Sequence, residues 1–131
     1  MNEIIIEAKT ENIDKVVEFI NERLGDCPMK VRNQIEIAVD EIFSNIANYA
    51  YQPEIGGVTV RVAVDSDITI EFEDNGFAYD PLSKDDPDIA LPVGIRKAGG
   101  LGIFMVKKMM DSVEYRHEGD RNILTIQKGL N

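Results

Sequence analysis

The longest regular pattern of apolar positions covers residues 31–51. Its apolar side chains recur at steps of three and four residues, which places them on one face of an α-helix. The residues of this face are Ile35, Ala38, Ile42, Ile46 and Tyr49. The pattern therefore predicts an amphipathic helix that packs against the core.

Two polar residues of this helix, Glu41 and Asn45, lie four positions apart at the edge of the apolar face. Their side chains are therefore neighbours on the helix surface. A buried carboxylate without a partner costs several kcal/mol, so an inward-facing Glu41 would need a polar or charged group opposite it. A solvated pair would contribute only a few tenths of a kcal/mol. The helix alone favours the solvated pair, and the choice depends on the rest of the chain.

Shorter patterns predict the remaining elements. β-Branched residues predict a strand at 3–8, and a second amphipathic helix begins at Thr10 and ends at Gly25. Alternating apolar residues at 58–64 and 68–73, separated by the polar residues 65–67, predict an antiparallel hairpin. A helix is predicted at 101–110, and a second hairpin at 112–127 turns at residues 118–120.

This order of elements predicts an α+β fold, a two-layer α/β sandwich in which a mostly antiparallel sheet is covered on one face by three helices. The 131 residues suit a single domain, 1–131, with the first strand at an edge of the sheet. The loops after Tyr51, after Asp74 and before Leu101 would then meet at one end of the sandwich.

The composition narrows the classes of function. A hydrophobic content of 44% with 29% charged residues is typical of a globular protein. The net charge of -10 argues against nonspecific binding to nucleic acid or to an anionic membrane, and favours a protein partner or a small ligand held in a local positive patch. The single cysteine, Cys27, excludes an intramolecular disulfide, and no leader or spanning segment of about twenty apolar residues is present. The cytoplasm is the expected compartment.

Glycines mark the first candidate site. Gly99, Gly100 and Gly102 open the last predicted helix, where free backbone N–H groups favour an anion such as phosphate. Flexible entry to a helix explains the same glycines. Arg96 and Lys97 stand just before them, at the end of a segment of more than twenty residues, 77–100, that contains three prolines. A loop of that length is typical of a lid or a binding segment.

A second candidate follows the strand at 68–73. Asp74-Asn75-Gly76 is typical of a turn that ends a strand. It would also suit ligand binding, because Asp74 can accept a hydrogen bond from an exocyclic amine and Gly76 leaves room for a flat ring.

Together, these stretches resemble a known family. A helix with Glu41-x-x-x-Asn45, a strand ending in Asp74-x-Gly76, a lid-like loop and Gly99-Gly100-Leu101-Gly102 before a helix are similar to the N, G1 and G2 boxes of the GHKL ATPase superfamily. The chain looks most like the anti-sigma-factor serine kinases of this superfamily, over nearly its whole length. The resemblance implies the Bergerat-type ATP-binding fold.

The resemblance also implies roles for single residues. Asn45 would hold Mg²⁺ that bridges the ATP phosphates, and Glu41 would be the general base. Asp74 would bind the adenine amine, with Gly76 beside the ring. The glycines at 99, 100 and 102 would bind the phosphates. The resemblance also implies that the ATP site includes Asn48, Ala78, Leu101 and Asn122.

The chain departs from the family pattern at three places. Ala78 stands where a further glycine is frequent. In the family a threonine on a late strand commonly supports the adenine-binding aspartate, and in this chain Asn122 or Thr125 would have to serve in its place. Ala98 stands where some members have a basic residue, and the basic pair at 96–97 lies earlier.

The leading hypothesis is an ATP-dependent protein serine/threonine kinase that acts as an anti-sigma factor. It would sequester a sigma factor or a similar regulator and phosphorylate a serine of an anti-anti-sigma antagonist protein, and the resemblance suggests a homodimer. A second hypothesis is a nucleotide-dependent partner-binding module without phosphotransfer, and a third is an interaction domain without a nucleotide. No direct contact with nucleic acid and no membrane association are expected.

Overall fold

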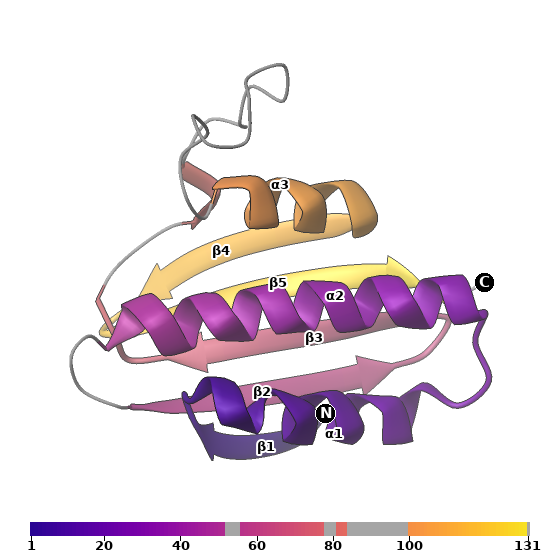
Figure 1. The fold of residues 1–131 in the computed structure, drawn as a ribbon, viewed down its shortest axis with the longest axis horizontal. Coiled ribbons are helices and arrows are strands. Elements are labelled where there is room, and N and C mark those ends of the chain that lie inside the picture. Colours follow the sequence, from indigo (N-terminus) through magenta and orange to yellow (C-terminus); the bar gives the residue numbers. More distant parts are fainter. Residues whose placement is uncertain (52–55, 78–80, 84–99, 131) are drawn as a thin grey trace.

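The computed structural model describes residues 1–51, 56–77, 81–83 and 100–130. In this part of the chain, a five-stranded sheet carries three α-helices on one face (Figure 1). The strands are β1 (Asn2–Glu7), β2 (Gly57–Val64), β3 (Asp67–Asp74), β4 (Ser112–Glu118) and β5 (Arg121–Gly129). The α-helices are α1 (Ile13–Leu24), α2 (Met29–Asn45) and α3 (Gly100–Met109). Short helical turns are η1 (Thr10–Asn12), η2 (Ile46–Ala50) and η3 (Pro81–Ser83).

The sheet has the strand order β1-β2-β3-β5-β4, and each neighbouring pair is antiparallel. The two-layer sandwich predicted from the sequence is therefore confirmed, and β1 lies at an edge as expected. The register places Asp74 opposite Val58 on one side and opposite Asn122 on the other. His117 of β4 continues the same row, because it lies opposite Asn122.

The core lies between the sheet and the helices. Alternate residues of the inner strands are buried, as a sheet with one covered face requires. The largest of the fully buried side chains are Phe43, Phe72, Ile20, Ile35, Ile42, Ile68, Ile70 and Ile126. They come from α1, α2, β3 and β5. The three- and four-residue spacing of the helices and the alternation of the strands therefore identify the faces that meet in the core.

The central helix differs from its prediction at both ends. It begins at Met29, directly after Pro28, whose fixed φ suits a helix start. The α-helix ends at Asn45, and the chain continues as the wider π-helical turn η2. The carbonyl of Ala50 at the end of η2 accepts a hydrogen bond from the backbone N–H of Phe77, at 2.9 Å. The end of the central helix is therefore tied to the turn after β3.

The sheet face away from the helices is charged. Arg61 bridges Glu3 at 3.3 Å and Glu73 at 3.1 Å, and Arg121 reaches Glu73 at 3.5 Å. These pairs link neighbouring strands across a surface that no described helix covers. None of the helices in the described residues has the length and apolar character needed to cross a bilayer.

Candidate functional site

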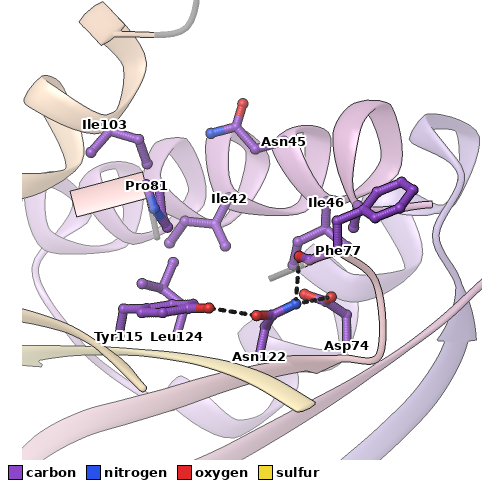
Figure 2. Close-up of a pocket in the computed structure, with 11 residues that line it drawn as sticks. Ile42, Asn45, Ile46, Asp74, Phe77, Pro81, Ile103, Tyr115, Asn122 and Leu124 are labelled. Atoms are coloured by element: carbon purple, nitrogen blue, oxygen red, sulfur yellow. Dashed lines mark hydrogen bonds between the residues drawn. The ribbon is translucent and has the colours of Figure 1, made fainter. Parts of the chain in front are cut away.

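The end of α2, the end of β3 and the starts of α3 and β5 lie at the same end of the sandwich (Figure 1). A pocket opens there (Figure 2). It is lined by Ile42, Asn45, Ile46, Ala50, Asp74, Phe77, Pro81, Ile103, Tyr115, Asn122 and Leu124. Most of these side chains are apolar, and the few polar groups are concentrated on the strands. The elements that flank the three loops predicted to converge thus meet at this pocket, while most residues of the loops themselves lie outside the described residues.

Asp74, the last residue of β3, forms the polar floor of the pocket. It is only 7% exposed, and its Oδ1 accepts hydrogen bonds from the backbone N–H of Gly76 and from Nδ2 of Asn122, both at 2.9 Å. Burial raises the pKa of Asp74, while these two hydrogen bonds act in the opposite direction. Within the described residues no donor reaches Oδ2. The second oxygen is therefore left to accept a hydrogen bond from a ligand.

Asn122, the second residue of β5, holds this carboxylate in place. Its Nδ2 donates to Asp74 and, at 3.0 Å, to the carbonyl of Phe77. Its Oδ1 accepts from the hydroxyl of Tyr115 at 2.5 Å and lies 3.1 Å from Nδ1 of His117. Thr125, the other residue considered for this supporting role, lies opposite Glu71 and Glu114 on the other face of the sheet. The register therefore places Asn122, and not Thr125, beside the aspartate.

Gly76 is required by a close approach of two backbone segments. A Cβ at this position would overlap with the backbone carbonyl of Ala50. The same turn is held by Tyr51, whose hydroxyl donates to the carbonyl of Gly57 at 2.7 Å and accepts from the N–H of Asn75 at 2.8 Å. The turn after β3 is therefore fixed against η2 on both sides.

Asn45, the last residue of α2, lies on the opposite wall of the pocket, and Glu41 lies one turn earlier in the same helix. Asn45 is half-buried and lines the pocket, and its amide points away from Asp74 and Asn122 (Figure 2). Glu41 does not line the apolar pocket; its carboxylate lies against Gly102 in the first turn of α3, where a Cβ would overlap with it. Burial raises the pKa of Glu41, and the negative charge of Asp40 raises it further. Glu41 is therefore a half-buried carboxylate between two helices, not a fully solvated surface group.

The glycine cluster lies partly within the described residues. Gly100 is the first residue of α3, and Leu101 and Gly102 follow in its first turn. Gly99 and Ala78 lie outside the described residues, as do the basic pair at 96–97 and most of the predicted lid. Asn48 is exposed on η2 and does not line the pocket, so its contact with a ligand stays a prediction.

Some residues of the pocket were not singled out from the sequence. They are Phe77, Pro81, Ile103, Tyr115 and Leu124. The alternation of β4 does place Tyr115 and His117 on one face of a strand, but the sequence pattern does not say which strand lies beside them. Only the pairing of β4 with β5 brings them to Asn122.

The fold is a small antiparallel sandwich whose pocket lies between the end of its central helix and a buried carboxylate on an inner strand. The chain belongs to the histidine kinase-like ATPase domain family, because the family model matches residues 6–128.

Curated relatives are serine-protein kinases. The serine-protein kinase RsbW of Bacillus cereus (strain B4264) is 30% identical over 95 residues, which are 69% of this chain and 59% of that protein. RsbW of Bacillus anthracis is 28% identical over the same length. The chain thus spans about 59% of the length of the curated relatives that it matches.

Solved structures confirm the fold. The RsbU and RsbW domains of a Mycobacterium tuberculosis protein superpose with a TM-score of 0.65 at 14% identity, covering 99% of this chain and 32% of that one. The histidine kinase domain of a blue-light activated histidine kinase from Erythrobacter litoralis superposes with a TM-score of 0.58 at 18% identity, covering 92% of this chain and 60% of that one. At these identities the likeness concerns the fold alone.

Proposed function

We propose that this chain binds Mg-ATP and transfers the γ-phosphoryl group to a serine of a protein substrate. The observation that carries the proposal is the buried Asp74, whose Oδ2 has no donor among the described residues and faces an apolar pocket. An exocyclic amine on a flat ring would satisfy this oxygen, and the adenine of ATP carries such an amine. The apolar walls from α2 and β5 would contact the two faces of the ring.

The phosphates would extend from the adenine towards Asn45 and the start of α3. Support comes from the position of Gly100 and Gly102 in the first turn of α3, where backbone N–H groups favour an anion. The described residues contain no group of three His, Cys, Asp or Glu side chains that could hold a metal ion. An amide oxygen from Asn45 with phosphate oxygens and water would suit Mg²⁺, which takes few protein ligands. Mg²⁺ bound there would offset the negative charge of the phosphates.

Glu41 would act as the general base of the transfer. It would take the proton from the serine hydroxyl while the serine oxygen attacks the γ-phosphorus. The bond between the γ-phosphorus and the β,γ-bridging oxygen then breaks, and ADP leaves with that electron pair. The raised pKa of Glu41 supports this role, because a carboxylate with a raised pKa is a stronger base.

The proposed partners follow from the resemblance to the anti-sigma-factor kinases. The chain would sequester a sigma factor or a similar regulator and phosphorylate an anti-anti-sigma antagonist, in the cytoplasm. We also propose a homodimer, for which the edge strand β1 is a candidate contact because its outer side has no paired strand in the described sheet.

Thermal unfolding with and without Mg-ATP tests nucleotide binding. A ligand at about a hundred times its dissociation constant should stabilise the wild type by roughly 2.7 kcal/mol and raise the midpoint by several degrees. Asp74→Asn should weaken ATP binding and remove most of the shift, because an amide N–H group would replace Oδ2 and face the adenine amine. Asp65→Asn is the matched control, since Asp65 is exposed in the β2–β3 turn at the far end of β3. If the wild type does not shift over a wide range of ATP concentrations, the proposal is wrong.

Phosphotransfer is tested separately with labelled ATP and a candidate anti-anti-sigma protein. Glu41→Gln should abolish transfer and keep the thermal shift with Mg-ATP. If the wild type binds ATP but transfers no label to any such protein, the chain is instead a nucleotide-dependent partner-binding module.

A further inference from the structure

The carboxamide of Asn122 has one correct orientation. Its Nδ2 faces three acceptors, namely Oδ1 of Asp74 at 2.9 Å, the carbonyl of Phe77 at 3.0 Å and the carbonyl of Gly76 at 3.3 Å. A rotation of the amide by 180° would turn its oxygen towards all three, so each attraction would become a repulsion. Because Asn122 is only 5% exposed, water would offset little of that repulsion.

Tyr115 gives the oxygen end of this amide its closest donor. Its hydroxyl lies 2.5 Å from Oδ1 of Asn122, while His117 lies farther away, at 3.1 Å. Tyr115 belongs to the edge strand β4 and pairs with Leu124, so it reaches diagonally across the sheet to Asn122. Figure 2 shows the ring on the pocket floor beside Leu124, with the hydroxyl directed at Asn122.

We propose that Tyr115 is a positioning residue that sets the base selectivity of the pocket, an inference that rests on the proposed nucleotide binding. The hydroxyl of Tyr115 orients Asn122, and Asn122 occupies Oδ1 of Asp74 together with the N–H of Gly76. Only Oδ2 then remains to meet the base. An ionised carboxylate oxygen accepts hydrogen bonds and donates none, so it attracts a 6-amino group and repels a 6-oxo group.

Removing the Tyr115 hydroxyl should therefore affect nucleotides unequally. Without this donor, the three acceptors still determine which end of the Asn122 amide faces Asp74, but Asn122 loses its shortest hydrogen bond and the carboxylate that it holds is positioned less tightly. A nucleotide that uses Oδ2 loses a well-aligned hydrogen bond, whereas a nucleotide that does not use Oδ2 loses little. A role of Tyr115 in packing alone would instead weaken all nucleotides by the same factor.

The test measures the dissociation constants of Mg-ATP and Mg-ITP, which differ at the 6-position of the base, by calorimetry. Tyr115→Phe keeps the ring and should weaken ATP by about tenfold, the value of one hydrogen bond of about 1.4 kcal/mol, and ITP by less than about twofold. Val113→Ala is the matched control, because Val113 lies on the same face of β4, packs against the core and does not line the pocket. It should lower the thermal midpoint without changing the ratio of the two constants.

A double variant tests whether Tyr115 acts on base selectivity through Asp74. In the Asp74→Asn background the preference for ATP should already be lost, and Tyr115→Phe should then leave the ratio unchanged. If Tyr115→Phe weakens ATP and ITP by equal factors, or weakens neither, the inference is overturned while the proposed ATP site stands. If the wild type binds neither nucleotide, the proposed function fails and the inference fails with it.

Discussion

Gly76 lies in the turn after β3, which approaches η2 closely. Gly76→Ala should therefore lower the stability of the fold at the pocket. An added Cβ would overlap with the carbonyl group and the Cβ of Ala50. These atoms cannot rotate away as a long side chain can, because the carbonyl accepts the N–H of Phe77 at 2.9 Å. Among the described residues only Gly25 and Gly119 have a positive φ, so the effect at Gly76 is steric and does not come from backbone strain.

The expected cost has two parts. Moving the turn away from η2 loses the Phe77–Ala50 hydrogen bond, worth about 1 kcal/mol net. Overpacking of a closely packed site typically costs about 1–3 kcal/mol. Gly76→Ala should therefore lower the free energy of unfolding by roughly 2–4 kcal/mol, and the thermal midpoint by roughly 6–14 °C for a chain of this size.

Two other glycines provide controls in the same urea and thermal unfolding assays. At Gly102 the added Cβ meets the end of the Glu41 side chain, which can rotate, and alanine is the better helix former by about 1 kcal/mol. Gly102→Ala should therefore change stability by less than about 1 kcal/mol. At Gly119 the space is open but φ is 62°, so alanine should cost about 1–2 kcal/mol. If Gly76→Ala costs no more than Gly119→Ala, the reasoning from close approach is refuted.

Three further substitutions test the packing and the electrostatics. Phe43→Ala removes a fully buried ring and should lower the free energy of unfolding by about 3–5 kcal/mol in urea denaturation, and a loss below about 1 kcal/mol would contradict the packing. Tyr51→Phe removes the hydrogen bonds to Gly57 and from Asn75 and should cost about 1–3 kcal/mol, seen as a lower thermal midpoint; an unchanged midpoint would show that these bonds are not stabilising. Asp74→Asn tests pH dependence. Because burial raises the pKa of Asp74, the stability that it contributes below the unfolded-state pKa is lost as the pH rises through the folded-state pKa. The stability of the variant relative to the wild type should therefore increase as the pH rises above about 4, the usual pKa of an unfolded aspartate, and a constant difference would contradict the raised pKa.

The secondary structure was largely predictable from the sequence. The alternation in residues 58–64 and 68–73 identified β2 and β3 to within one residue at each end. The three- and four-residue steps identified the buried face of α2, where Ile35, Ala38 and Ile42 are each at most 1% exposed. Such patterns are informative because one face of each element is buried and the other is solvated, which imposes a period on the chain.

The surroundings of the site residues were less predictable than the secondary structure. The pattern of α2 favoured a solvated Glu41, whereas the structure packs its carboxylate against Gly102, because α3 lies alongside α2. The continuous helix predicted to residue 51 ends at Asn45, and η2 continues it as a wider turn. The surroundings of Glu41 are not local, since they depend on a helix about 60 residues further along the chain.

The sequence by itself determined which residues form strands and helices, which faces are apolar, and that Asp74 ends a strand. Only the tertiary structure decided the surroundings of that aspartate. Asn122 reaches it across 48 positions of sequence, and Tyr115 reaches Asn122 from the edge strand. The physical reason is that strand register is set by the packing of whole faces. A slip of one residue in β5 would turn Asn122 to the opposite face of the sheet and remove the support of Asp74.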